Sequence, residues 1–456
     1  MNSTITAGTP QSTAQASPSA ASGQPEGKLS PGVIAVNTVS FALAFAAWVM
    51  FGPSVRFIAK ELGLSLSVAT LIKTLPVLVG SCARVPVGIL TDRIGARLTF
   101  PLMLLASAGG VYMASLSTSV TSLTVMALVI GLAGSTFVVG VQSVSAWTPK
   151  AKQGFALGLF GAGNVGTAIT TFGLPILLTS LGWRGSFRIY ALMLVVTAAG
   201  YWLLMRNAPR VGAAPTFGAL LAPLKSLRTW RFGLYYMATF GVFMAATLTV
   251  TDIYIDGYKV SVRTAGLLAT TFTFSASLIR ILGGKLSDRL GARLTLRLSL
   301  LTVAAALFPI SLGLPLAATV TLVLIAGLAM GIGSAATFRY IPDYFPKSVG
   351  AVGGAVGALG GLGGFLLPQV GTAMKTAFGS AGVQVIPLAA VALLAVLVQH
   401  VTVRRLDRAT RETNQTASDL VSMASQVSPS LADQRPVSAG TNAEQRNADR
   451  LERISR

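Results

Sequence analysis

Long apolar segments recur along most of this chain, and short polar segments separate them. Each apolar segment has about 20 residues or more, enough to cross a hydrocarbon core of ~30 Å as an α-helix. The apolar residues run continuously, whereas the strands of a membrane barrel alternate apolar and polar residues. The pattern therefore predicts an all-α polytopic membrane protein.

Twelve transmembrane helices are predicted between two polar tails. They cover residues 32–54, 65–90, 98–117, 120–147, 154–179, 184–205, 232–254, 262–287, 295–313, 316–341, 349–377 and 381–401. The longest connection between them, a cytoplasmic linker over residues 206–230, divides the spans into six and six. We expect an N-terminal six-helix bundle over residues 31–205 and a C-terminal six-helix bundle over residues 231–401.

The tails are residues 1–30 and 402–456. The first consists mainly of Ser, Thr, Ala, Gly and Pro, so we expect it to be disordered, and it lacks the pattern of a signal peptide. An even number of spans places both tails on one side of the membrane. The loops on that side contain 15 Lys and Arg, and the opposite loops contain seven. This excess predicts cytoplasmic termini in a multi-pass protein of the cell inner (plasma) membrane.

Composition excludes several classes of protein. Only 11% of the residues are charged, less than half of the ~25% typical of soluble domains, which excludes a soluble enzyme. The net charge of +21 comes from basic residues scattered through loops, so we expect contact with the lipid bilayer and no nucleic acid. One cysteine and one histidine leave no ligand set for a metal. We expect no cofactor and no enzymatic activity.

The two halves repeat each other. Residues 84–99 read RVPVGILTDRIGARLT, and residues 280–295 read RILGGKLSDRLGARLT. Ten residues of the first segment recur 196 positions later, and two Gly-rich segments, residues 149–166 and 346–364, have about the same offset. Duplicated six-span halves resemble the major facilitator superfamily. That fold consists of two pseudo-symmetric bundles with the substrate site near mid-membrane between them.

Arg84 and Arg280 are candidate ligands inside the membrane. Each precedes an Asp at the end of its span, Asp92 or Asp288, by eight residues, which is roughly 12 Å at ~1.5 Å per residue. None of the 14 acidic residues is expected deep in a span, and an uncompensated charge there marks a functional site. The guanidinium fork matches coplanar oxygens, whereas Lys is a point charge. The pair would suit a small planar monoanion, and also a carboxylate or a phosphate.

Separated segments are similar to the nitrate/nitrite porter family of this superfamily. They are GLFGAGNVGTAITTFGLP (158–175), GAVGALGGLGGFLLP (354–368), YMATFGVF (236–243) and ATFRYIPDYFPK (336–347). The resemblance covers residues 31–401 and implies transport of nitrate and nitrite. It also implies further substrate-binding residues: Asn164 and Tyr236 as hydrogen-bonding ligands, Phe240, Phe137 and Phe338 as walls, and Gly163 and Gly361 in the Gly-rich helices.

Structural alternatives exist for these residues. Asn164 would otherwise join two helices, and the aromatic residues would be ordinary core. Lys73, roughly 16 Å from Arg84 along the helix, either attracts anions or extends toward the membrane interface. The two Asp-Arg loops are predicted to control access to the substrate site by shifting the equilibrium between the inward-facing and outward-facing conformations. Their residues are Asp92, Arg93, Arg97, Asp288, Arg289 and Arg293.

The leading hypothesis is a monomeric carrier that exchanges nitrate and nitrite by alternating access. With no carboxylate expected in the core, antiport is favoured over the alternative of a proton-coupled nitrate symporter. A carrier of another small anion, such as formate or oxalate, also fits the arginine pair. An anion channel would need a continuous pore, and a sensor would need a soluble output domain, for which the tails are too short and too polar.

Overall fold

The computed structural model describes residues 30–149, 153–207, 218, 222–344 and 349–427, and these residues form helices and no strand. The N-terminal half contains α1 (Pro31–Trp48), α2 (Phe51–Leu62), α3 (Leu66–Cys82), α4 (Arg84–Ile94), α5 (Ala96–Leu116), α6 (Val120–Ile130), α7 (Leu132–Ala146), α8 (Gln153–Gly161), the 3₁₀ turn η3 (Ala162–Val165) and α9 (Gly166–Leu204). Residues 1–29 of the predicted N-terminal tail (1–30) and residues 428–456 of the predicted C-terminal tail (402–456) lie outside the described residues.

The C-terminal half contains a similar series of helices. They are η4 (Ala222–Lys225), α11 (Leu227–Tyr236), the π-helical turn η5 (Met237–Gly241), α12 (Val242–Tyr258), α13 (Val262–Leu290), α14 (Ala292–Leu307), η6 (Phe308–Leu312), α15 (Leu316–Tyr344), α16 (Val349–Phe378), η7 (Gly382–Val385) and α17 (Ile386–Val427).

The described helices account for the predicted membrane spans. Ten are long and apolar enough to cross a membrane, or eleven when α3 and α4, which are bent by 46° at Ala83, count as one span. One of the ten, Phe155–Leu204, contains a turn at Gly182, where φ is 66° and ψ is 175°. This turn lies between the predicted fifth and sixth spans. Divided there, the described helices form twelve spans.

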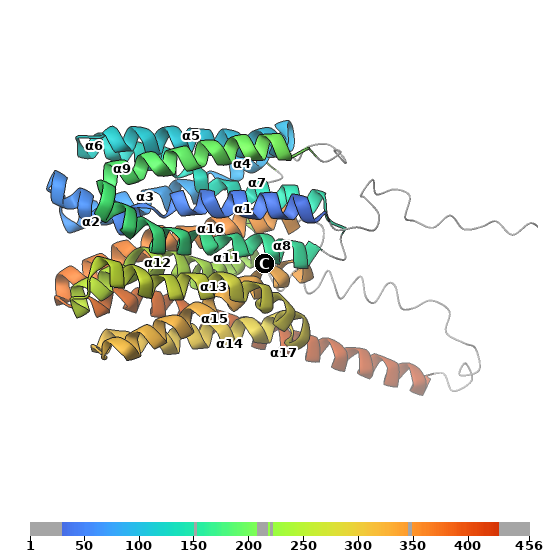
Figure 1. The fold of residues 1–456 in the computed structure, drawn as a ribbon. Coiled ribbons are helices and arrows are strands. Elements are labelled where there is room, and N and C mark those ends of the chain that lie inside the picture. Colours follow the sequence, from blue (N-terminus) through green and yellow to red (C-terminus); the bar gives the residue numbers. More distant parts are fainter. Residues whose placement is uncertain (1–29, 150–152, 208–217, 219–221, 345–348, 428–456) are drawn as a thin grey trace, which may run out of the picture.

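The halves form two adjoining groups of helices (Figure 1). Helices α5, α6 and α9 lie on one side of the molecule, α13, α14 and α15 lie on the other, and α8 and α16 lie between them. Across the boundary α3 contacts α16, and α13 contacts α8, η3 and α9. A substrate site between the halves must therefore be built from these helices.

The repeated loops have the same backbone shape. Gly95 and Gly291 occupy equivalent positions in the two repeats and have φ values of 84° and 82°. Glycine adopts this conformation at little steric cost, which explains its presence at both positions. The sequence repeat is therefore also a repeat of local structure.

Large apolar side chains cover the outside of the bundle. Exposed examples from both halves are Leu102, Leu105, Leu192, Val196, Leu298 and Leu397. Such a surface is unfavourable in water and favourable against hydrocarbon. The exterior thus supports the predicted position of the bundle in a bilayer.

Two element boundaries differ from the prediction. Helix α17 continues to Val427, beyond the predicted end of the last span at residue 401. The polar segment after residue 401 is rich in helix formers, and the next Gly or Pro is Pro429. In addition, η4 and the start of α11 lie inside the predicted linker, residues 206–230.

The bundle has two distinct ends in Figure 1. Helix α1 begins at one end, and α17 leaves the bundle at the same end, which we call the terminal end. Helix α2 lies at the opposite end, which we call the distal end.

Candidate anion-binding site

Arg84 and Arg280 come from opposite halves, and both guanidinium groups lie near one aromatic ring. Arg84 is the first residue of α4, directly after the bend from α3, and Arg280 lies within α13. The guanidinium carbons of Arg84 and Arg280 are 5.6 Å and 5.9 Å from the ring centre of Phe240. The two carbons are therefore at most 11.5 Å apart, the sum of these distances. The structure brings together the two arginines that the repeat singles out.

Both arginines are buried without a carboxylate partner. Arg84 exposes 2% of its surface and Arg280 exposes 7%. Among the described residues, neither guanidinium takes part in an ion pair. Removing a cation from water is costly unless an opposite charge compensates it. These two residues therefore form a site with a deficit of negative charge.

The arginine donors are only partly used. Arg84 donates from Nη1 to the backbone carbonyl of Gly357 on α16, while its buried Nε has no partner. Arg280 donates from Nη2 to the hydroxyl of Tyr236 over 3.5 Å, which is a long contact. Buried donors are normally satisfied, so the open Nε points to a ligand position.

Aromatic rings surround the two guanidinium groups. The rings of Tyr236 and Phe240 stack with centres 4.9 Å apart, and the ring of Phe338 meets Tyr236 edge-on at 4.9 Å. Phe137 lies 5.1 Å from the Arg84 guanidinium carbon and 6.3 Å from Phe338. All four predicted aromatic residues thus belong to one cluster. Their faces attract cations, and their bulk restricts the space left for an anion.

The π-helical turn η5 carries Phe240 into this cluster. It interrupts the helix between Tyr236, the last residue of α11, and Val242, the first of α12. A Cβ atom on Gly241 would lie 2.5 Å from the carbonyl of Gly360, so the turn packs directly on α16. Single π-turns inside α-helices are frequent at functional sites.

Asn164 is a buried amide whose hydrogen-bonding groups are both unused. It exposes 1% of its surface, and neither Oδ1 nor Nδ2 has a partner. It lies on η3, and η3 contacts α13, which carries Arg280. Just before η3, a Cβ atom on Gly161 would lie 3.8 Å from Nε of Arg280. Among the described residues, the Asn164 side chain forms no hydrogen bond to another helix.

The two predicted glycines have different surroundings. A Cβ atom on Gly361 would lie 2.1 Å from Oγ of Ser81 and 3.8 Å from Nη1 of Arg84, so this glycine lets α16 approach the arginine. A Cβ atom on Gly163 would instead lie 2.6 Å from the ring of Phe41 on α1. Close packing against α1 accounts for Gly163. Gly357, which the sequence did not single out, accepts the Arg84 hydrogen bond.

The Asp-Arg loops make contacts within their own halves. Arg97 donates from Nε to the carbonyl of Trp202 over 3.1 Å, and Asp288 forms a 2.8 Å ion pair with Nε of Arg339. The other loop residues are half-buried or exposed: Asp92, Arg93, Arg289 and Arg293. Their gating role stays a prediction.

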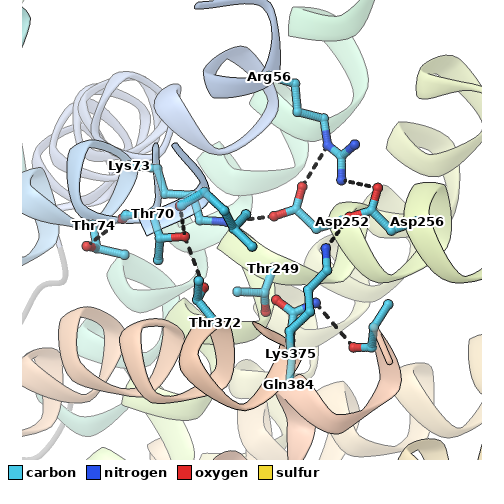
Figure 2. Close-up of polar contacts among 12 residues, drawn as sticks. Arg56, Thr70, Lys73, Thr74, Thr249, Asp252, Asp256, Thr372, Lys375 and Gln384 are labelled. Atoms are coloured by element: carbon cyan, nitrogen blue, oxygen red, sulfur yellow. Dashed lines mark hydrogen bonds and ion pairs between the residues drawn. The ribbon is translucent and has the colours of Figure 1, made fainter. Parts of the chain in front are cut away.

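A network of ion pairs at the distal end was missed by sequence analysis. Asp252 on α12 exposes only 8% of its surface and pairs with Nζ of Lys73 at 2.6 Å and with Nε of Arg56 at 2.8 Å. Asp256, one turn later, pairs with Nη2 of Arg56 at 2.9 Å and with Nζ of Lys375 (Figure 2). Asp252 lies near the end of its span and not deep within it, and Lys73, for which sequence analysis proposed anion attraction or extension toward the interface, pairs with this carboxylate.

The sequence matches the family model of the Major Facilitator Superfamily over residues 38–368 and again over residues 232–439. A "Probable nitrate/nitrite antiporter NarK1" of Thermus thermophilus is 39% identical over 408 residues, which cover 82% of this chain and 92% of that protein. A "Nitrite extrusion protein" of Bacillus subtilis (strain 168) is 30% identical over 364 residues, which cover 79% and 91% of the two chains.

Solved structures show the same fold. The human organic anion transporter MFSD10 (TETRAN) has a TM-score of 0.64 at 17% identity and covers 81% of this chain and 99% of its own. A bacterial homolog of the human lysosomal transporter Spinster has a TM-score of 0.63, also at 17% identity, and covers 83% and 98%. Taken with the sequence matches, the twelve spans in repeated halves show that the chain belongs to the Major Facilitator Superfamily and, within it, to the nitrate/nitrite porter family.

Proposed function

We propose that this protein carries nitrate and nitrite across the membrane by alternating access and holds the anion between Arg84 and Arg280. The observation that carries the proposal is a pair of buried guanidinium groups, one from each half, that both lie near the ring of Phe240. Since no carboxylate of the described residues pairs with either arginine, the pair needs a negative ligand. The names of the relatives support nitrate and nitrite as that ligand.

The donors available at the site suit a small planar oxyanion. Arg84 offers its free Nε, and Arg280 has only a long contact from Nη2. A guanidinium group presents its N–H donors in one plane, which matches the coplanar oxygens of nitrate and nitrite. The unpaired amide of Asn164 adds a further donor for an oxygen. The rings of Phe137, Phe240 and Phe338 limit the size of the anion.

Alternating access requires the halves to rock about the bound anion. Because Arg84 and Arg280 belong to different halves, the anion binds both halves together by charge-assisted hydrogen bonds. On α16, Gly357 and Gly361 present only backbone to the side chains of Arg84 and Ser81, so the two halves approach closely beside the arginine.

The excess of Lys and Arg in the loops supports a cytoplasmic terminal end and a distal end that faces outward. The chain would then lie in the cell inner (plasma) membrane with both termini in the cytoplasm. We propose that the single chain is the transporting unit, because both arginines and the aromatic cluster come from one chain.

Exchange of nitrate for nitrite is the favoured coupling. Proton-coupled symport would need a titratable group that gains and loses a proton during transport. Asp252 is a candidate for such a group because its carboxyl is buried within the bundle. However, it already pairs with Lys73 and Arg56 at the distal end. Antiport needs no such group, since the anion itself enables reorientation.

Transport of labelled nitrate into proteoliposomes tests the function. Vesicles are loaded with nitrite, nitrate, formate, chloride or buffer alone. We expect rapid uptake only with nitrite or nitrate inside. Equal uptake with formate inside would favour the alternative of a carrier for small anions such as formate or oxalate, and uptake driven only by an inward proton gradient would favour symport.

A further inference from the structure

The distal ion-pair network crosses the boundary between the halves. Arg56 on α2 and Lys73 on α3 belong to the N-terminal half. Their acidic partners, Asp252 and Asp256, lie on α12 of the C-terminal half, as Figure 2 shows. If the carrier opens at this end, these contacts must separate, because the two sets of residues move with different halves.

Further contacts place this crossing at a closed part of the interface. The hydroxyls of Thr70 on α3 and Thr372 on α16 are 2.9 Å apart, and Gln369 donates to Thr74 over 2.8 Å (Figure 2 shows the threonine pair). Lys73 exposes only 2% of its surface. Its ammonium group is therefore shielded from water while the halves are in contact.

Separation would leave the two halves with opposite charges. The N-terminal half retains two cations, Arg56 and Lys73. The C-terminal half retains Asp252, Asp256 and Lys375, with a net charge of −1. Opening therefore breaks these ion pairs, and an anion that replaces the carboxylate on the two cations favours the open state, because it binds there and not in the closed state.

The Asp252 carboxylate has the shape and charge of the proposed substrate. It is planar, carries one negative charge, and accepts from Arg56 Nε through Oδ1 at 2.8 Å and from Lys73 Nζ through Oδ2 at 2.6 Å. Nitrite and nitrate are also planar monoanions with two or three coplanar oxygens. The same two donors can hold them in the same way.

We infer that Arg56 and Lys73 form a second site for small planar oxyanions, which Asp252 fills while the distal end is closed and which the incoming anion takes when the halves separate. The inference rests on the proposed function for the identity of the anion. Because the anion replaces the Asp252 carboxylate on Arg56 and Lys73, opening of the distal end depends on the concentration of anion on that side. From this site the anion continues toward Arg84, eleven residues farther along the bent pair α3 and α4.

A spin-label distance measurement on the full chain in nanodiscs tests the inference. Labels on Lys60→Cys of α2 and Ala377→Cys of α16, both exposed, report distal opening in a Cys82→Ser background. Nitrate is titrated, with chloride as the comparison anion. We expect nitrate to increase the open fraction and chloride to do so much less, because a single atom cannot bridge the donors as two oxygens do.

Two substitutions distinguish an anion-binding site from an ion-pair network that only holds the distal end closed. Asp252→Asn frees the donors, so the nitrate concentration for half-maximal opening should fall at least about tenfold. Glu61→Gln is the control, because Glu61 pairs with Arg184 of the same half and its side chain is 45% exposed; it should change that concentration by less than about threefold. If Asp252→Asn opens the distal end but nitrate has no further effect, the ion pairs only hold the two halves together and the inference is wrong.

A third variant separates this site from the arginine pair. In Arg280→Lys the proposed site between the halves is impaired, yet nitrate should still open the distal end. Loss of the response in this variant overturns the inference, whereas failure of the proposed function would appear as absent nitrate uptake by the wild-type protein. If Asp252→Asn does not fold, Arg56→Gln replaces it, because the Arg56 side chain is 32% exposed and the change should be tolerated. This variant should weaken the opening response to nitrate, and an unchanged response would also overturn the inference.

Discussion

The empty carrier should reorient much more slowly than the carrier with a bound anion. When no anion is bound, Arg84 and Arg280 present two positive charges whose guanidinium carbons are at most 11.5 Å apart, the sum of 5.6 Å and 5.9 Å. At an effective dielectric constant of about 20, two unit charges at this distance repel by about 1.4 kcal/mol. An occluded state excludes the water that screens this repulsion in an open cavity.

A bound monoanion lowers the charge of the site and attracts both arginines. A barrier difference of about 1.4 kcal/mol corresponds to a tenfold difference in rate. Labelled nitrate uptake should therefore be at least about tenfold faster into vesicles that contain nitrite or nitrate than into vesicles with an impermeant buffer. The initial rate is measured by rapid filtration, with the membrane potential clamped.

The control is protein-free vesicles with the same internal anion, which should show only passive leakage. An imposed pH gradient should have little effect on the rate. Equal initial rates into anion-free and nitrite-loaded vesicles, combined with acceleration by an inward proton gradient, would refute the electrostatic reasoning and favour proton symport.

Three further predictions address individual contacts. Asn164→Ala should weaken nitrate binding by about 1–3 kcal/mol, the value of a hydrogen bond to a charged group; unchanged affinity in calorimetry would assign Asn164 to packing. The double variant Thr70→Cys/Thr372→Cys should form a disulfide under oxidant, since the two hydroxyl oxygens that the sulfurs replace are 2.9 Å apart. The disulfide should block transport until a reductant is added. Full activity of the cross-linked protein would show that the distal end need not open. Asp92→Asn should slow transport more than it changes nitrate affinity, and a pure loss of affinity would contradict the gating role.

The arginine pair could be predicted from the sequence because two simple signals coincide. The repeat relates Arg84 to Arg280, and a charge inside an apolar span is conspicuous in a membrane protein. The aromatic residues were expected from family resemblance and not from spacing alone. In the structure Phe137, Tyr236, Phe240 and Phe338 form one cluster, and their contact with the anion stays a prediction.

Backbone irregularities at the site could not be predicted. The π-turn at Phe240, the 3₁₀ turn at Asn164 and the bend before Arg84 interrupt segments whose apolar pattern reads as continuous helix. Each depends on packing between helices that are distant in sequence, as the close approach of Gly241 to Gly360 illustrates.

The distal network was missed for a different reason. Asp252 lies near the end of a span, where hydropathy does not distinguish a buried residue from one at the interface. Asp252 and Asp256 are one helical turn apart and therefore lie on one face of the helix. This spacing could have predicted a cluster of ion pairs, because two neighbouring carboxylates favour cationic partners. Their partners Arg56, Lys73 and Lys375 lie on three other helices, so only the tertiary structure identifies them.

Nitrate binding to purified Arg84→Lys and Arg280→Lys proteins, measured by calorimetry, tests the central claim most directly. Each substitution keeps the charge and removes the planar fork, so affinity should fall by about 10- to 100-fold. Arg297→Lys, at an exposed position on α14, is the matched control and should bind like the wild type. Equal melting temperatures show that the proteins are folded. Near wild-type affinity in either arginine variant would contradict the assignment of the anion site.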